Sequence, residues 1–329
     1  MRRVLPWIAL AAALAAGAQA ETLKVGVFRG TSASGAIYVA KEKGYFAQAG
    51  LDTEVVVFDA GEAVAVATVS GAIDIGAAGV SAAFYNLASQ GSIRVVSGIN
   101  RDVPGFQAVA LVASNHAYDG GLHGFADLAG RSVALTTVGS TFHYAVGLIE
   151  EKLGLDVKSV KIIAAQGLPN VASAVAGGQA DSAIVPTPFA APLIEKGAVK
   201  LVGYVADIAP SQVGIAWVTK ATADTKADMV RRYLAAYRKG VHDYHAAFTG
   251  PGETRKDGPT APEVLAIIAK YTGQTAAQID GGISYIDPEG RIDARDIQHQ
   301  IDWFRAQGMI KGEIDAATLI DKRYATTLP

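Results

Sequence analysis

Small polar residues stand at four points where a predicted strand ends and a predicted helix begins. These segments are 29–35 (RGTSASG), 77–81 (AAGVS), 136–141 (TTVGST) and 186–189 (PTPF). Hydroxyl groups donate hydrogen bonds to ligand oxygens, and glycine lets the backbone approach closely. Helix N-termini add unpaired N–H groups and a partial positive charge. Residues of these types suit the binding of an oxyanion or a carboxylate.

Each segment taken alone has a simpler explanation, because Ser and Thr are the preferred N-cap residues of helices. Four such segments, two in each half of the repeat described below, favour a shared ligand cleft. Gly79, Thr137 and Phe189 lie within them and are candidate contacts. Arg101 follows the predicted strand 93–99 and is either a counter-ion for an acidic ligand or an ion-pair partner of Asp102.

Aromatic residues near these segments form either the floor of an organic ligand pocket or part of the core. They are Phe28, Phe84, Tyr85, Phe106, Phe142, Phe189 and Trp217.

Several kinds of catalytic and cofactor site are missing from the sequence. The chain contains no cysteine, which excludes disulfides and thiol nucleophiles. It also lacks the G-x-x-x-x-G-K-[ST] and G-x-G-x-x-G motifs, so neither a phosphate loop nor a dinucleotide fingerprint is present. Residues 79–83 faintly resemble a nucleophile elbow, but the second glycine is absent. We therefore predict no cofactor, no metal and no catalysis.

Composition and the first twenty residues indicate an exported protein. Half of the 329 residues are apolar and 18% are charged, which excludes disorder, and the length suffices for two domains. The formal charge of −2, without a basic run, argues against nucleic acid as a partner. Arg2 and Arg3 precede an apolar stretch that ends at the small-x-small sequence 18–20, so we expect a signal peptide cleaved near Ala20.

Strand and helix patterns alternate through most of the chain. Strands are expected at 23–28, 53–58, 73–77, 93–99, 132–136, 160–165, 182–185, 200–205 and 212–219. Helices are expected at 36–48, 62–70, 81–89, 141–153, 171–177 and 189–196, then at 226–248, 261–271, 294–307 and 316–324. Most of the strands are continuous apolar runs, which is typical of sheets covered by helices on both faces.

The alternating units form two similar sets. Gly30-Thr31-Ser32 corresponds to Gly139-Ser140-Thr141, and the sequence GAID at 71–74 corresponds to GQAD at 178–181. We predict an α/β fold of two lobes, each a mostly parallel sheet flanked by helices, with a hinge between them. Residues 21–112 and 212–329 are assigned to lobe I and residues 113–211 to lobe II. The stretch 113–130 is interpreted as a crossover.

An ordered set of short motifs resembles the solute-binding proteins of ABC importers for nitrate, sulfonates and taurine. The set comprises AKEKGYF at 40–46, GLD at 50–52, GAIDIG at 71–76, GSTFHY at 139–144 and DWF at 302–304. The resemblance extends from Leu23 to about Tyr324 and implies a type II-like periplasmic-binding-protein fold. It also implies a periplasmic, monomeric protein that closes on a small anion and delivers it to a membrane permease.

Carried over to this sequence, the resemblance implies ligand contacts from both lobes. In lobe I these are Thr31, Ser32, Ser34 and Ser81, and in lobe II Ser140, Thr141 and Thr187. The first loop lacks the larger polar residue expected in sulfonate binders, which leaves the ligand open. Alternatives are a neutral or cationic heterocycle such as a thiamine pyrimidine precursor, a periplasmic sensor, and an exported hydrolase using Ser81 or Ser140.

Overall fold

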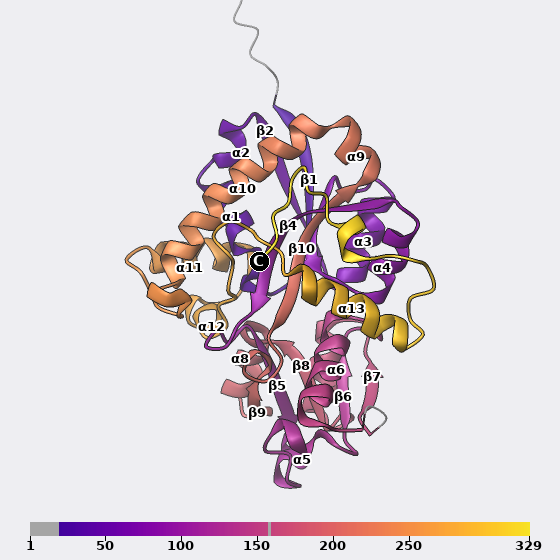
Figure 1. The fold of residues 1–329 in the computed structure, drawn as a ribbon. Coiled ribbons are helices and arrows are strands. Elements are labelled where there is room, and N and C mark those ends of the chain that lie inside the picture. The colour runs from indigo at the N-terminus through magenta and orange to yellow at the C-terminus, as the bar shows by residue number, and fades with distance from the viewer. Residues whose placement is uncertain (1–19, 157–158) are drawn as a thin grey trace, which may run out of the picture.

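The computed structural model describes residues 20–156 and 159–329. The predicted signal peptide therefore lies outside the described residues except for Ala20. Two lobes lie one above the other, each built around a five-stranded sheet (Figure 1). Within the described part of the chain, no helix is both long and apolar enough to span a bilayer.

The first sheet has the strand order β2-β1-β3-β10-β4. Its strands are β1 (Glu21–Phe28), β2 (Leu51–Phe58), β3 (Ile75–Gly79), β4 (Ile93–Asp102) and β10 (Ser211–Thr219). Strand β1 runs parallel to β2 and β3, whereas β10 is antiparallel to both of its neighbours. Strand β10 thus returns the chain from the lower lobe to the upper one, as the sequence predicts.

The second sheet repeats this arrangement with the order β7-β6-β8-β5-β9. Its strands are β5 (Val109–Ser114), β6 (Ser132–Leu135), β7 (Lys161–Ala164), β8 (Ser182–Pro186) and β9 (Val199–Tyr204). Here β5 is the antiparallel strand. The sequence analysis missed β5: its residues 109–112 were assigned to lobe I and residues 113 and 114 to the crossover, but all six pair in the second sheet.

Helices cover both sheets. In the upper lobe they are η1 (Ser32–Ser34), α1 (Gly35–Glu42), α2 (Tyr45–Gln48), α3 (Gly61–Val69), α4 (Ala82–Ser89), α9 (Lys220–Thr225), α10 (Ala227–Phe248), η4 (Pro251–Glu253), α11 (Ala261–Thr272), α12 (Ala276–Asp280), α13 (Ala294–Ala306) and α14 (Ala316–Leu319). In the lower lobe they are α5 (Asn115–Asp119), η2 (Phe125–Leu128), α6 (Thr141–Leu153), α7 (Leu168–Ala176) and α8 (Thr187–Glu195), with η3 (Val205–Asp207) where the chain leaves it.

The apolar core forms two clusters. One cluster lies between the first sheet and helices α1, α10 and α11. The other continues from the second sheet through α6 and α13 to α4, so it extends across the boundary between the lobes. Helix α13 lies against α6 at this boundary (Figure 1). The indole of Trp303 covers Gly147, where an added Cβ would lie 2.3 Å from the ring.

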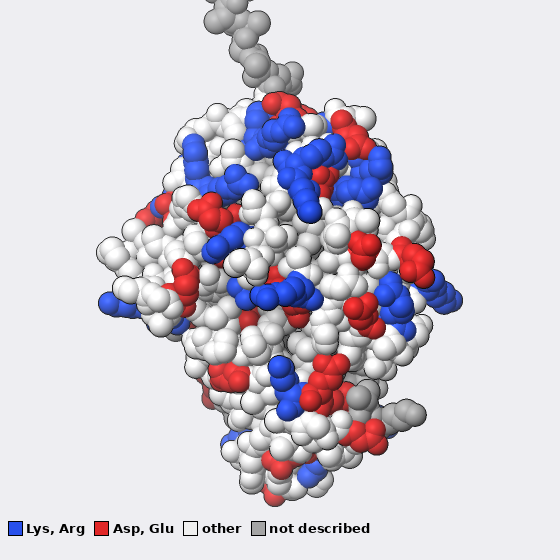
Figure 2. Space-filling view, in the orientation of Figure 1, with Lys and Arg blue, Asp and Glu red and all other residues white. Residues whose placement is uncertain are grey.

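Charged side chains of both signs are spread over the surface. On the face shown in Figure 2, Lys and Arg side chains gather mainly over the upper lobe, with Asp and Glu between them.

Candidate functional site

A cavity of about 730 Å³ lies between the two sheets and is lined by both lobes. The upper lobe contributes the ends of β1, β3 and β4 and the segments that follow them, and the lower lobe contributes the segment 136–142 and Pro186. Of the eleven candidate ligand contacts named from the sequence, seven line it: Thr31, Ser34, Gly79, Ser81, Thr137, Ser140 and Thr141.

Three of the lining hydroxyls are N-caps whose oxygen atoms already accept a backbone hydrogen bond. Thr31 Oγ1 accepts from the N–H of Ala33 at 2.9 Å. Ser81 Oγ accepts from Phe84 at 3.1 Å, and Ser140 Oγ accepts from His143 at 3.3 Å. None of the three donates to a protein acceptor within the described residues. Their hydroxyl hydrogens are therefore free to bond to an acceptor atom in the cavity.

Two hydrogen bonds join the lobes beside the cavity. Thr141 Oγ1 donates to the carbonyl of Val80 at 2.6 Å, and the N–H of Ala82 donates to the carbonyl of Gly139 at 2.8 Å. Gly79 permits this approach, because a Cβ there would lie 2.5 Å from Thr141 Oγ1. The two lobes are therefore in direct contact beside the cavity.

The lobes also meet through Pro188 and Gly282. A Cβ on Gly282 would lie 2.3 Å from the Pro188 ring.

Asn100 is one of the polar residues of the cavity that sequence reasoning missed, together with Glu62 and Ser284. Its side chain lines the cavity and is only 4% exposed, yet its amide makes no hydrogen bond within the described residues. An amide that lines a cavity and bonds to no described residue can both donate to and accept from a ligand. The sequence analysis ended this strand at residue 99, three residues before the end of β4, and so placed Asn100 outside it.

Apolar surface separates the polar groups of the cavity. Phe28 and Phe142 line it from opposite lobes and meet edge to face, with ring centroids 6.3 Å apart. Ile99, Val109 and Val213 add aliphatic surface. A ligand with an organic body would find contact here. The sequence analysis left both phenylalanines open between pocket and core.

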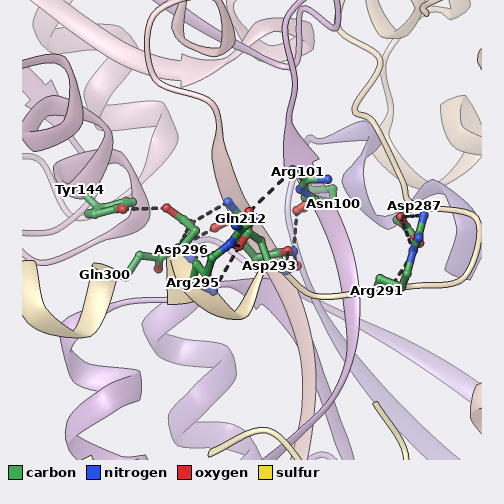
Figure 3. Close-up of polar contacts among 11 residues, drawn as sticks. Asn100, Arg101, Tyr144, Gln212, Asp287, Arg291, Asp293, Arg295, Asp296 and Gln300 are labelled. Atoms are coloured by element: carbon green, nitrogen blue, oxygen red, sulfur yellow. Dashed lines mark hydrogen bonds and ion pairs between the residues drawn. The ribbon is translucent and has the colours of Figure 1, made fainter. Parts of the chain in front are cut away.

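The other four candidate ligand contacts named from the sequence do not line this cavity. Ser32 is buried and donates to the carbonyl of Gly282 at 2.7 Å. Arg101 forms an ion pair of 3.8 Å with Asp293 (Figure 3), and not with Asp102. Phe189 lines a neighbouring cavity of about 820 Å³.

The fourth, Thr187, follows the lining residue Pro186 and is buried. Its Oγ1 has no hydrogen-bond partner among the described residues.

A polar network where β10 leaves the lower lobe links α13 to both lobes (Figure 3). Asp296 accepts from the N–H of Gln212 and from Gln300 Nε2, both at 2.8 Å, and from the Tyr144 hydroxyl at 2.8 Å. Gln212 Nε2 in turn donates to the carbonyl of Asn100 at 3.1 Å. Burial raises the pKa of Asp296, and burial beside that carboxyl raises the pKa of Tyr144.

Asp102 is a second buried carboxyl close to this polar network. It is the last residue of β4, and its Oδ1 has no hydrogen-bond partner among the described residues. Burial, with a smaller contribution from Asp296, raises the pKa of Asp102 to about 7.

Solved structures with a similar architecture include sulfonate-binding and nitrate-binding proteins. The alkanesulfonate-binding protein SsuA from Xanthomonas axonopodis pv. citri bound to MOPS has a TM-score of 0.72 at 19% identity, covering 91% of this chain and 98% of that one. The aliphatic sulphonate binding protein SsuA from Escherichia coli has a TM-score of 0.70 at 18% identity, covering 94% of both chains.

The nitrate-binding protein NrtA from Synechocystis PCC 6803 has a TM-score of 0.71 at 15% identity, covering 92% of this chain and 86% of that one. These likenesses show the two-lobed periplasmic-binding-protein fold that the sequence predicts.

A search of curated proteins finds no sequence that matches the chain. The family described as "NMT1/THI5 like" matches residues 32–249, which is more than half of the chain and includes most of the cavity. The chain therefore belongs to the NMT1/THI5 like family.

Proposed function

We propose that the chain is the extracytoplasmic solute-binding component of an ABC importer and binds a small organic or inorganic anion between its lobes. The observation that carries this proposal is the set of N-cap hydroxyls of Thr31, Ser81 and Ser140, which come from both lobes, line one cavity and donate to no described residue. The similar structures include an alkanesulfonate-binding and a nitrate-binding protein. Nitrate and sulfonate groups offer only acceptor oxygens to such donors.

Binding would follow from closure of the lobes. In an open form, a solute would reach the hydroxyls of Thr31 and Ser81 on the upper lobe. Closing would bring the hydroxyl of Ser140 onto the same solute and form the bond between Thr141 and Val80. A solute that contacts both lobes stabilises the closed form, because it gains contacts there that the open form lacks.

Export, location and partners belong to the same proposal. The chain would be cleaved near Ala20, act in the periplasm as a monomer and deliver its solute to a membrane permease. The division of the chain into two lobes, with the second formed by one continuous insertion, is also part of it.

The geometry around the two candidate nucleophiles favours binding over hydrolysis. Ser81 and Ser140 both use their oxygens as helix caps. The ring of His143 is turned to Gly139, whose N–H donates to His143 Nδ1 at 3.0 Å. Within the described residues, neither serine therefore has a hydrogen-bonded base that could remove its proton.

The test is a thermal-shift screen of the protein against nitrate, sulfonates, aliphatic and aromatic carboxylates, and pyrimidines. A ligand present at about 100 times its Kd stabilises the fold by about 2.7 kcal/mol, which a melting curve resolves. We expect an anion to raise Tm and to lose this effect in the Ser81→Ala/Ser140→Ala double variant. Stabilisation by a pyrimidine alone, or an anion effect that persists in the double variant, would contradict the proposed site.

A further inference from the structure

The charge of the cavity differs from what a simple anion site requires. Among the described residues that line it, Glu62 is charged and no Lys or Arg is present. The two arginines nearest in sequence to the lining residues are engaged elsewhere, Arg29 with Asp59 and Arg101 with Asp293. A purely anionic solute would therefore meet a carboxylate without any compensating cation.

Glu62 has no partner of its own. It is the second residue of α3, and it makes no hydrogen bond or ion pair with any described residue. A carboxylate in the first turn stabilises a helix by interacting with its dipole, wherever the side chain points. That role does not account for a position on the cavity wall.

The helix is held close to the ligand-facing end of β3. A Cβ on Gly61 would lie 2.6 Å from the carbonyl oxygen of Gly79, so glycine is needed for this approach. Gly79 leads directly to the N-cap Ser81. The same wall of the cavity thus presents an acceptor that carries a full negative charge and a hydroxyl with a free hydrogen.

We propose that the solute carries a cationic nitrogen, an ammonium or a protonated ring nitrogen, in addition to its oxyanion group, and that Glu62 is the counter-ion of this nitrogen. This inference rests on the proposed function. The hydroxyls of Thr31, Ser81 and Ser140 hold the oxyanion, and Glu62 holds the cation. Phe28 and Phe142 also suit such a group, because aromatic rings attract cations.

Matched pairs of compounds test the inference. We would measure Tm shifts and Kd for 3-aminopropane-1-sulfonate against propane-1-sulfonate, and for 4-aminobutanoate against butanoate. A third arm contains propylamine and 4-aminopyrimidine, which have no oxyanion. The protein is purified after expression of the full chain. We expect the aminated acids to bind more tightly than their partners without nitrogen, by about fivefold for a partly exposed ion pair.

The Glu62→Gln variant should remove this preference by weakening the aminated acids. Glu263→Gln is the matched control, because Glu263 is a first-turn acid of α11 that does not line the cavity. It should leave the preference intact. Urea unfolding of both variants establishes that they are folded.

The outcomes separate the inference from the proposed function. Equal or tighter binding of the acids without nitrogen, or a preference that survives Glu62→Gln, overturns the inference and leaves the function standing. Binding of the amines alone overturns the anion function but keeps Glu62 as a counter-ion. If neither acid series binds and the amines also fail, both proposals are wrong.

Discussion

Asn100 and Arg101 are neighbours in β4, yet Asn100 lines the cavity and Arg101 does not. Asn100 faces the cavity, whereas Arg101 is directed to Asp293 in the segment before α13 (Figure 3). Successive side chains of a strand alternate between faces, so a shift of one residue exchanges a cavity residue for an outer one. We therefore expect the uncharged amide of Asn100, and not the guanidinium of Arg101, to contact a ligand.

Replacement of Asn100 by Ala should weaken ligand binding with little effect on folding. The amide has no protein partner to lose, whereas a bound solute would lose a hydrogen bond of about 0.5–1.5 kcal/mol. Isothermal titration with a solute from the screen measures this change. Arg101→Ala is the matched variant and should leave Kd unchanged. Weaker binding by Arg101→Ala, with an unchanged Kd for Asn100→Ala, would show that the arginine contacts the solute.

Ser81→Ala should lower both stability and affinity. Loss of the N-cap costs about 0.5–2 kcal/mol of folding free energy, and the solute loses a hydroxyl donor. Ser114 is a matched control, since it caps α5 with the same 3.1 Å bond but lies outside the cavity. Urea unfolding should show similar losses for both variants, and titration should show weaker binding for Ser81→Ala alone. Equal affinities would exclude Ser81 from the site.

Thr141→Val should shift the protein toward an open form. The substitution keeps the shape of the side chain but removes the donor to Val80, at a cost of about 0.5–1.5 kcal/mol. Small-angle X-ray scattering without ligand should report a larger radius of gyration. Thr272→Val removes a hydroxyl-to-carbonyl bond within α11 and should leave the radius unchanged. A Thr141→Val radius equal to that of the wild type would mean that this bond does not control closure.

Asp102→Asn should make stability less dependent on pH. The folded state raises the pKa of Asp102 from 3.8 to about 7, so the folded protein holds a proton that the unfolded chain releases above pH 4. The contribution of Asp102 to stability is therefore largest at low pH and is lost as pH rises to about 7. Urea unfolding at pH 5 and pH 8 should show that wild type loses stability relative to the variant.

Asp315 provides the control for this measurement. Its pKa is lowered by hydrogen bonds from Thr318, so it stays ionised at both pH values. Asp315→Asn should differ from wild type by the same amount at pH 5 and pH 8. If the difference in unfolding free energy between Asp102→Asn and wild type were also the same at pH 5 and pH 8, the raised pKa of Asp102 would be contradicted.

The alternation of strands and helices was sufficient to predict most of the fold. It failed at β5 because β5 follows β4 with no helix between them, where the chain crosses to the other lobe. The apolar run at 109–114 was itself a strand signal, but the alternating pattern left no place for it. The predicted helix 36–48 is divided at Gly44, whose φ of 71° ends α1 and starts α2.

The candidate site was partly visible because glycines and hydroxyl residues mark the ends of strands in sequence. Asn100 and Glu62 carried no such mark. Asn100 depended on the register at the end of β4, and Glu62 resembled an ordinary first-turn acid of a helix. Their roles follow only from the close approach of elements that are distant in sequence, such as α3 and the end of β3.

The position of β10 between β3 and β4 has a consequence for the order in which the chain acquires its structure. Strand β4 is at the edge of the first sheet and pairs there with β10, which begins more than a hundred residues later. The second sheet, in contrast, is formed by one continuous stretch from β5 to β9. Local contacts form faster than distant ones. The lower lobe can therefore complete its sheet first, whereas β4 can pair only after β10, which ends at Thr219, has been added to the chain.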